Sequence, residues 1–331
     1  MKHSSIRRKT FLGTAVAAAF ALGAFTSQAL AQAWPDKPVK IVVPFSAGGT
    51  TDVVARMLGA RLGEMWNQSV VIENRAGAGG NIGADAVAKS APDGYTLLMT
   101  SGSIVTVNPH IYAKMPFDAK KDLVPITNVA QGPMLLSVSA DLPVKNVKEL
   151  IALAKSKPGS LNFGSAGVGT QVHMAGENFA YAAGIDVLHV PYRGESAALA
   201  DLAGGQIQLI AANLTASLPF VKQGKVRALG VTSLERSPTL PDIPTVSESG
   251  LKGFQNLGWF GLMAPAGTPK AVLDKVHADT AKALSETAVK ARLYVVGMTP
   301  VGNSPAEFTE AIAREYENWG KVVAERKLAR R

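Results

Sequence analysis

The sequence contains no cysteine among its 331 residues. This absence excludes disulfide bonds, thiolate metal sites, thiol nucleophiles and a lipid-modified cysteine near the N-terminus. The stability of the protein must therefore come from a packed core. A chain of this length that is 47% hydrophobic and 18% charged can build a large one, and we expect either two domains or one large domain.

Histidine is also scarce, with five residues in the whole chain. No two of them have the H-x-x-x-H or H-E-x-x-H spacing of a helical metal site, so we expect no metal. Four lie beyond the first 33 residues: His110, His173, His189 and His277.

The motifs of nucleotide binding and of nucleophilic catalysis are incomplete. The segment from Gly159 to Ser165 has the glycine spacing of a Walker A loop but not its lysine. The glycine clusters at 77–80 and 167–169 both lack the third glycine of the dinucleotide fingerprint. Ser165 lacks the glycine two positions earlier that a G-x-S-x-G elbow requires. We therefore expect no cofactor and no enzyme, although a catalytic triad that assembles only in space is not excluded by sequence.

The first 33 residues lack acidic side chains and have the pattern of an export signal. A basic stretch, MKHSSIRRKT, precedes about 15 apolar residues, and small residues at alternate positions lead to Ala33. The apolar run is shorter than the roughly 20 residues of a membrane span, which disfavours an uncleaved anchor. Arg7-Arg8 resembles a twin-arginine signal, but Phe11 stands one place late, so both the Sec and the twin-arginine routes remain open. We expect a cleaved signal at 1–33 and a periplasmic protein.

No long apolar run follows the leader, so we expect the mature chain to be soluble. The leader carries four basic residues, and its removal lowers the formal net charge from +9 to +5. The remaining positive charge is spread along the chain apart from a short basic tail at 325–331. Such a distribution does not favour nucleic acid as a partner.

Strand-like and helical patterns alternate from residue 38 onward, which indicates βαβ units and a largely parallel sheet. Strands are predicted near 40–45 and 69–74, followed by helices from about Asp52 and Asn81. Asn146 with Glu149 forms a capping pair for a later helix, and the last third carries two helices. The final one opens at Ser304 with a capping box and a proline.

Two glycine-rich turns could each hold an anion at a helix N-terminus. Val43-Pro44-Phe45 and Val190-Pro191-Tyr192 each end a strand and lead through small residues into a helix, which suggests two lobes of related design. Turns 46–50 and 164–170 have the small residues that let a ligand approach the backbone. At the carboxyl ends of parallel strands, they would face one ligand cleft.

Several long segments, in this order, resemble the substrate-binding proteins of tripartite tricarboxylate transporters, often called Bug proteins. The likeness extends from about Trp34 to the C-terminus. The segments that carry it are VPFSAGGTTDVVAR, ENRAGAGGNIGADAVAKSAPDGYTLLMTS, NFGSAGVGTQVHMAGE, VPYRGESAALADLAGGQIQL and PTLPDIPTVSESG.

The resemblance implies an α/β, two-lobed periplasmic-binding-protein fold of the Venus-flytrap kind, each lobe a mostly parallel sheet flanked by helices. Lobe 1 would comprise 34–134 plus 251–331 and lobe 2 would comprise 135–250. The implied function is capture of a small carboxylate solute and delivery to an integral-membrane permease, by a monomer without metal, cofactor or covalent chemistry. A ligand sensor with a signalling partner, or a periplasmic hydrolase, is the alternative.

The resemblance also implies that loops of both lobes hold the ligand carboxylate. The lobe 1 candidates are Phe45, Ser46, Ala47, Gly48, Gly49, Thr50, Asp52, Ser101 and Ser103. The lobe 2 candidates are Ser165, Gly167, Gly169, Thr170, Gln171, Tyr192, Arg193 and Asn213. We interpret the glycines of 77–80 as structural.

The ligand itself is inferred from two departures from the family pattern. Gln208 and Asn213 are neutral where an acidic residue often occurs in the family, which makes lobe 2 less repulsive to an additional carboxylate. We therefore expect a mono- or dicarboxylate without an amine, with aromatic carboxylates among the candidates.

Overall fold

The computed structural model describes residues 34–328. The chain divides into the units Met1–Asp36 and Lys37–Arg331, and the fold described below is that of the second unit. The predicted export signal lies outside the described residues, as does the end of the basic tail. Across the described range, no helix combines the length and the apolar character that a membrane crossing would need.

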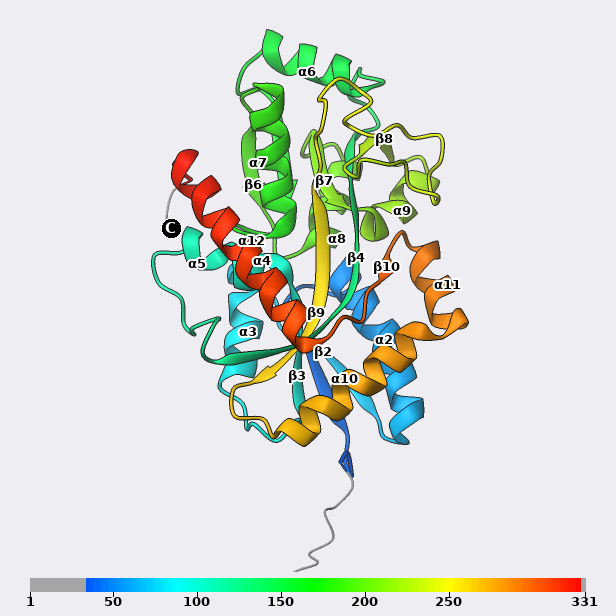
Figure 1. Ribbon diagram of the computed structural model, residues 1–331. Helices are drawn as coiled ribbons and strands as arrows, with labels where there is room; N and C mark the ends of the chain where they lie inside the picture. Colours follow the sequence, from blue (N-terminus) through cyan, green and yellow to red (C-terminus); the bar gives the residue numbers. More distant parts are fainter. Residues whose placement is uncertain (1–33, 329–331) are drawn as a thin grey trace, which may run out of the picture. The chain divides into compact units, whose positions relative to one another are not determined.

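The strands of residues 37–328 form one mixed sheet (Figure 1). Its order is β2-β1-β3-β9-β4-β7-β5-β6, and both β8 and β10 pair with β4. The strands are β1 (Val39–Val43), β2 (Val70–Asn74), β3 (Thr96–Ser101), β4 (Leu123–Ser139), β5 (Asn162–Ser165), β6 (Leu188–Pro191), β7 (Leu209–Asn213), β8 (Val226–Val231), β9 (Leu257–Pro265) and β10 (Thr299–Pro300).

Helices follow most of the strands and flank the sheet (Figure 1). They are α2 (Thr50–Trp66), the 3₁₀ turn η1 (Ala78–Gly80), α3 (Asn81–Ala88), α4 (Gly102–Thr106), α5 (Asn108–Ile111), α6 (Val147–Ser156), α7 (Gln171–Ala183), α8 (Glu195–Ala203), α9 (Leu214–Lys222), α10 (Lys270–Ser285), α11 (Thr287–Val295) and α12 (Pro305–Glu325).

Two long strands, β4 and β9, connect the two lobes. β4 pairs with β9 up to Pro133 and with β7 and β8 from Met134 onward. Following the predicted division, we call β1–β3, β9, β10, α2–α5 and α10–α12 lobe 1, and we call β5–β8 and α6–α9 lobe 2. This is the expected two-lobed α/β fold, but the prediction of a mostly parallel sheet is wrong. The pairs among β1–β3 and among β5–β7 are parallel, whereas every pair that β4 or β9 makes is antiparallel, because these two strands run between the lobes in opposite directions. The exact boundaries near residues 134 and 250 stay predictions.

The helix caps show how local sequence fixes the element boundaries. The side chain of Asn146 accepts a hydrogen bond from the Glu149 amide at 2.9 Å, and Ser304 forms a complete capping box with Glu307. Both predicted caps are confirmed. The prediction of two helices in the last third is wrong, because the backbone is extended at Glu286 and separates α10 from α11. Arg61 of α2 donates to the Glu286 carboxylate from Nε at 2.7 Å and from Nη2 at 2.8 Å. These two bonds hold the residue at which α10 ends and α11 begins.

The turn between β1 and α2 is held by Asp52, which is 3% exposed. Its carboxylate accepts hydrogen bonds from the Gly48 amide at 2.9 Å, from Arg56 at 3.0 Å and from Asn74 at 3.0 Å. Burial acts to raise the pKa of Asp52, but these hydrogen bonds outweigh it and lower the pKa below its ordinary value. The carboxylate therefore holds the glycine-rich turn in place.

We predict that Asp52→Asn lowers the free energy of unfolding by about 1 to 3 kcal/mol at pH 7, because it weakens hydrogen bonds made to a charged group. The pKa of Asp52 is lower in the folded protein, so its contribution is present above the ordinary aspartate pKa and is lost as the pH falls through the folded value. The difference in the free energy of unfolding between wild type and variant, measured by urea denaturation, should therefore become smaller at acidic pH.

Asp274→Asn is the matched control, because Asp274 forms an exposed pair with Lys270 on α10. Its effect should be about 0.5 kcal/mol or less. Equal effects of the two substitutions would contradict the role assigned to Asp52.

A second acid, the half-buried Glu315 of α12, connects the C-terminal helix to β9. Trp259 Nε1 donates to its carboxylate at 2.5 Å, and Trp319 Nε1 and the Thr106 hydroxyl donate at 3.2 Å each. Burial raises the pKa of Glu315, and these three donors only partly oppose that rise. No cation is among these partners.

We predict that Glu315→Gln stabilises the protein at pH 8 relative to wild type. The folded-state pKa of Glu315 is raised, so its contribution to stability is complete below the ordinary glutamate pKa and is lost as the pH rises through the folded value. Thermal midpoints of both proteins at pH 5 and pH 8 test this, and the advantage of the variant should appear on the alkaline side. Glu310→Gln, at an exposed pair on the same helix, should show no such dependence on pH.

Candidate functional site

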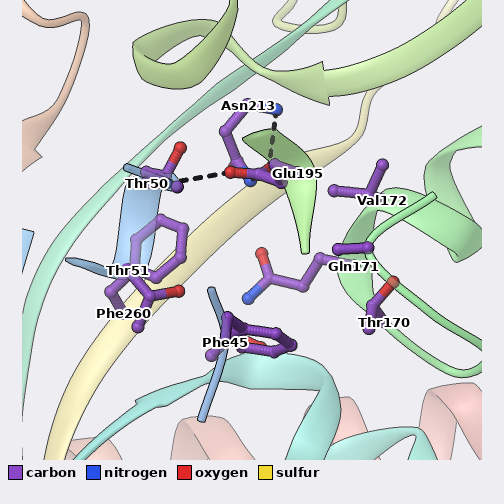
Figure 2. A pocket seen from close by; sticks show the side chains of 12 residues that line it. Phe45, Thr50, Thr51, Thr170, Gln171, Val172, Glu195, Asn213 and Phe260 are labelled. Carbon is purple, nitrogen blue, oxygen red and sulfur yellow. Dashed lines mark hydrogen bonds between the residues drawn. The ribbon is translucent and has the colours of Figure 1, made fainter. Parts of the chain in front are cut away.

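Loops that follow the carboxyl ends of the strands of both lobes meet beside β9, where open α/β sheets place ligands. They enclose a cavity of about 20 Å³ that we call the inner cavity, which is room for about one water molecule. Its lining is Phe45, Gly49, Thr50, Thr51, Ser101, Ala166, Thr170, Gln171, Val172, Glu195, Asn213 and Phe260 (Figure 2).

Two helices begin at the inner cavity, one from each lobe. α2 begins at Thr50 in lobe 1, and α7 begins at Gln171 in lobe 2, and both residues line the cavity. A helix N-terminus presents free backbone N–H groups and the positive end of the helix dipole. The N-cap of α2 is Gly49, which provides no side-chain cap. The cavity is therefore suited to accept an anionic group from a ligand.

Gln171 also connects the two lobes directly. Its Nε2 donates to the carbonyl oxygen of Trp259 at 2.8 Å, and the Trp259 amide donates to its Oε1 at 3.1 Å. Gly258 lies next to this pair, and a Cβ there would lie 2.4 Å from Gln171 Oε1. Glycine therefore lets β9 pass close to the site.

Glu195 is the functional residue that sequence reasoning missed. It is 6% exposed and is the one charged residue of the inner cavity lining. Its Oε2 accepts a hydrogen bond from the Thr50 amide at 3.0 Å, and its Oε1 accepts from the Asn213 amide at 3.1 Å and from Asn213 Nδ2 (Figure 2). A carboxylate of lobe 2 thus bonds the N-terminus of a lobe 1 helix. In the sequence, Glu195 has only the signal of an acidic residue in a first helical turn, which many helices show.

Two polar atoms of the same cavity lining are buried without a hydrogen-bond partner. They are Thr50 Oγ1 and Asn213 Oδ1, and their residues are 0% and 3% exposed. Leaving such a group unpaired costs about 1 to 3 kcal/mol.

A larger cavity of about 200 Å³, which we call the outer cavity, adjoins the inner one. Phe45 and Ala166 line both. The rest of its lining is Gly77, Ala78, Gly79, Gly80, Tyr112, Gly167, Val168, Pro191, Tyr192 and Arg193.

The walls of the outer cavity are fixed by contacts between and within the lobes. The Tyr112 hydroxyl donates to the Val168 carbonyl at 2.9 Å, and Tyr192 donates to Asp201 at 2.7 Å. Burial and then Asp201 raise the pKa of Tyr192 to about 12. Gly79 adopts a φ of +62°, and a Cβ there would lie 2.3 Å from the Val168 carbonyl oxygen, so this close approach requires glycine.

The structure brings ten of the seventeen predicted site residues to the two cavities. The predicted residues that line neither cavity have partners inside the protein, and their roles in binding stay predictions. They are Ser46, Ala47, Gly48, Asp52, Ser103, Ser165 and Gly169.

Several of these residues shape the loops of the site. The hydroxyls of Ser46 and Ser196 lie 3.2 Å apart across the lobes. Ser165 Oγ lies 2.6 Å from His189 Nε2 and accepts a hydrogen bond from the Gly167 amide. The Gly169 amide donates to His173 Nδ1 at 3.1 Å. These contacts fix the turns that lead into the cavities.

Comparison with known proteins identifies the family of this chain. The family model of the tripartite tricarboxylate transporter family receptor matches residues 54–328. Protein BugT of Bordetella pertussis is 38% identical over 296 residues, which is 89% of this chain and 91% of BugT.

Solved structures are similar in fold and in sequence. The adipate-bound protein Rpa4515 of R. palustris is 38% identical, with a TM-score of 0.88 over 90% of this chain and 100% of that one. Malate-bound MatC of Rhodopseudomonas palustris is 33% identical, with a TM-score of 0.83 over 88% of this chain and 100% of that one. These relatives are solute-binding proteins and not enzymes. The chain therefore belongs to the tripartite tricarboxylate transporter receptor family, among the Bug proteins.

Proposed function

We propose that this chain is a periplasmic receptor that captures a small carboxylate solute between its lobes and delivers it to a tripartite tricarboxylate permease in the membrane. The observation that carries the proposal is the inner cavity, where α2 of lobe 1 and α7 of lobe 2 both begin. Two helix N-termini from opposite sides can bind one carboxylate only when the lobes are together. Adipate and malate in related structures support the ligand class.

Solute entry requires the lobes to separate, because the inner cavity of about 20 Å³ is too small for a dicarboxylate. Separation would break a few polar contacts, such as those of Glu195 with Thr50 and of Tyr112 with Val168. Each such bond contributes about 0.5 to 1.5 kcal/mol net, so opening has a modest cost. A solute that contacts both lobes shifts the population toward closure, and the closed form is then what the permease recognises.

Isothermal titration calorimetry of the mature chain with a panel that includes adipate and malate tests the ligand class. We expect at least one small carboxylate to bind with one-to-one stoichiometry and a micromolar dissociation constant, about −8 kcal/mol. Native mass spectrometry of protein purified from cells would identify a solute carried along. The absence of binding by every carboxylate would refute the proposal.

We predict that Gln171→Ala weakens binding of that carboxylate about tenfold. The substitution removes both hydrogen bonds to Trp259 and with them a link that holds the lobes together. Calorimetry gives the affinity, and Gln223→Ala, at an exposed position after α9, is the matched control. Unchanged affinity in Gln171→Ala would show that its bonds to Trp259 do not help to hold the lobes together around the ligand.

Delivery to the permease is tested by uptake of labelled solute into cells that make the permease with and without this receptor. We expect uptake at micromolar solute to depend on the receptor. Binding without any effect on uptake would instead favour the ligand sensor.

A further inference from the structure

The end of helix α12 lies against helix α7 of the other lobe (Figure 1). Arg326, the residue that follows α12, donates from Nη1 to Asn178 Oδ1 at 2.6 Å. Asn178 Nδ2 donates in turn to Asn256 Oδ1 at 2.7 Å. The guanidinium carbon of Arg326 also lies 4.1 Å from the centre of the Tyr181 ring. A hydrogen bond from a charged donor is stronger than one between neutral groups, and the cation–π contact adds to it.

Apolar contacts join the same two helices. Val323 of α12 and Met174 of α7 belong to one hydrophobic cluster, and they are 7% and 1% exposed. Trp319 and Leu328 pack against this cluster as well. We call residues 319–328 the C-terminal strap. Because lobe 1 contains α12 and lobe 2 contains α7, the C-terminal strap connects the lobes by apolar and by polar contacts.

The backbone at the end of the C-terminal strap turns so that Leu328 reaches the cluster. Lys327 adopts a φ of +50°, a left-handed conformation that is unfavourable for a residue with a Cβ atom. The Leu328 amide donates to the Val323 carbonyl oxygen at 3.1 Å and closes the turn. This bond and the packing of Leu328 offset the unfavourable conformation. The strap thus ends in a turn that directs an apolar side chain into the cluster that both lobes share.

Helix α7 carries the lobe 2 half of the proposed solute site. Its first residue, Gln171, lines the inner cavity and donates to the carbonyl oxygen of Trp259 in β9. Asn178 follows Gln171 by two turns of the helix, which at 1.5 Å per residue is about 10 Å. None of residues 319–328 lines the inner or the outer cavity. The C-terminal strap therefore contacts the helix that would bind the solute, but at a distance from the solute itself.

We propose that the C-terminal strap raises the affinity for solute by holding α7 against lobe 1 when the lobes are together, and that Arg326 anchors it. Arg326 is thus a positioning residue that acts through α7. Contacts that form only between closed lobes increase the apparent affinity for any solute that requires closure, and they slow its release. They do not discriminate between solutes. This inference rests on the proposed function and adds to it a determinant of affinity outside the cleft.

Binding kinetics of the mature chain test the role of Arg326. The probes are small carboxylates that include adipate and malate, measured by calorimetry and by stopped-flow tryptophan fluorescence. In Arg326→Met, we expect about tenfold weaker binding of each solute that wild type binds, because a hydrogen bond from a charged donor is lost. The dissociation rate should rise by the same factor, whereas the association rate, which starts from separated lobes, should hardly change. The ratio of affinities between any two solutes should equal that of wild type.

Two further variants examine the same contact. Arg326→Lys keeps a positive charge near Tyr181 and should recover part of the lost affinity. Tyr181→Ala removes the ring from the lobe 2 side, at a position that is 69% exposed, and should weaken binding about two- to fivefold. Arg314→Met is the matched control, because Arg314 forms an exposed pair with Glu310 on the same helix, and it should change neither rate.

The thermal midpoint of the solute-free protein separates this role from a purely structural one. Separated lobes do not make the Arg326 contact, so the solute-free Arg326→Met protein should melt with wild type. A lower midpoint with an unchanged dissociation rate would overturn the inference, because Arg326 would then only support the fold. Unchanged affinity and dissociation rate, or a changed ratio between solutes, would also overturn it and leave the proposed receptor intact. If the wild-type chain binds no carboxylate, the proposed function fails, and this inference fails with it.

Discussion

The antiparallel pairing of β4 with β9 is the constraint on which the rest of the structure depends. Both strands pass from one lobe to the other, and their ladder runs from Leu123 paired with Pro265 to Pro133 paired with Leu257. Each lobe adds its own parallel strands beside this pair, so the carboxyl ends of both sets come to the same place. The turns after β1 and β5 meet there because the two strands hold the lobes in register.

The chemistry of the site follows from backbone groups that the fold leaves unpaired. Helices α2 and α7 both begin at the inner cavity, and one of their N–H groups, that of Thr50, is already taken by Glu195. The carboxylate of Glu195 therefore already uses one of the hydrogen-bond donors that the start of α2 offers. Arg193 supplies the complementary charge in the outer cavity.

The sequence predicted the turns and helix starts that depend on residues close to one another in the chain. Proline, glycine and capping residues placed the turn at 46–50 and the start of the final helix, since these depend on neighbours within a few positions. Local rules could not identify Glu195, because the amide that it bonds, that of Thr50, is 145 residues away and lies on the other lobe. The break at Glu286 was missed for a related reason, since Arg61 of another helix holds it.

The paired strands that join the lobes also limit how those lobes can move. Sliding β4 along β9 would break the whole ladder of hydrogen bonds from Leu123 to Pro133 at once, whereas bending the two-stranded ribbon near Gly132 and Gly258 breaks few of them. A bend across the paired strands would therefore cost less than a slide along them, and it would separate the lobes as the covers of a book separate. An opening of that kind would change the outline of the molecule while the packing inside each lobe stays the same.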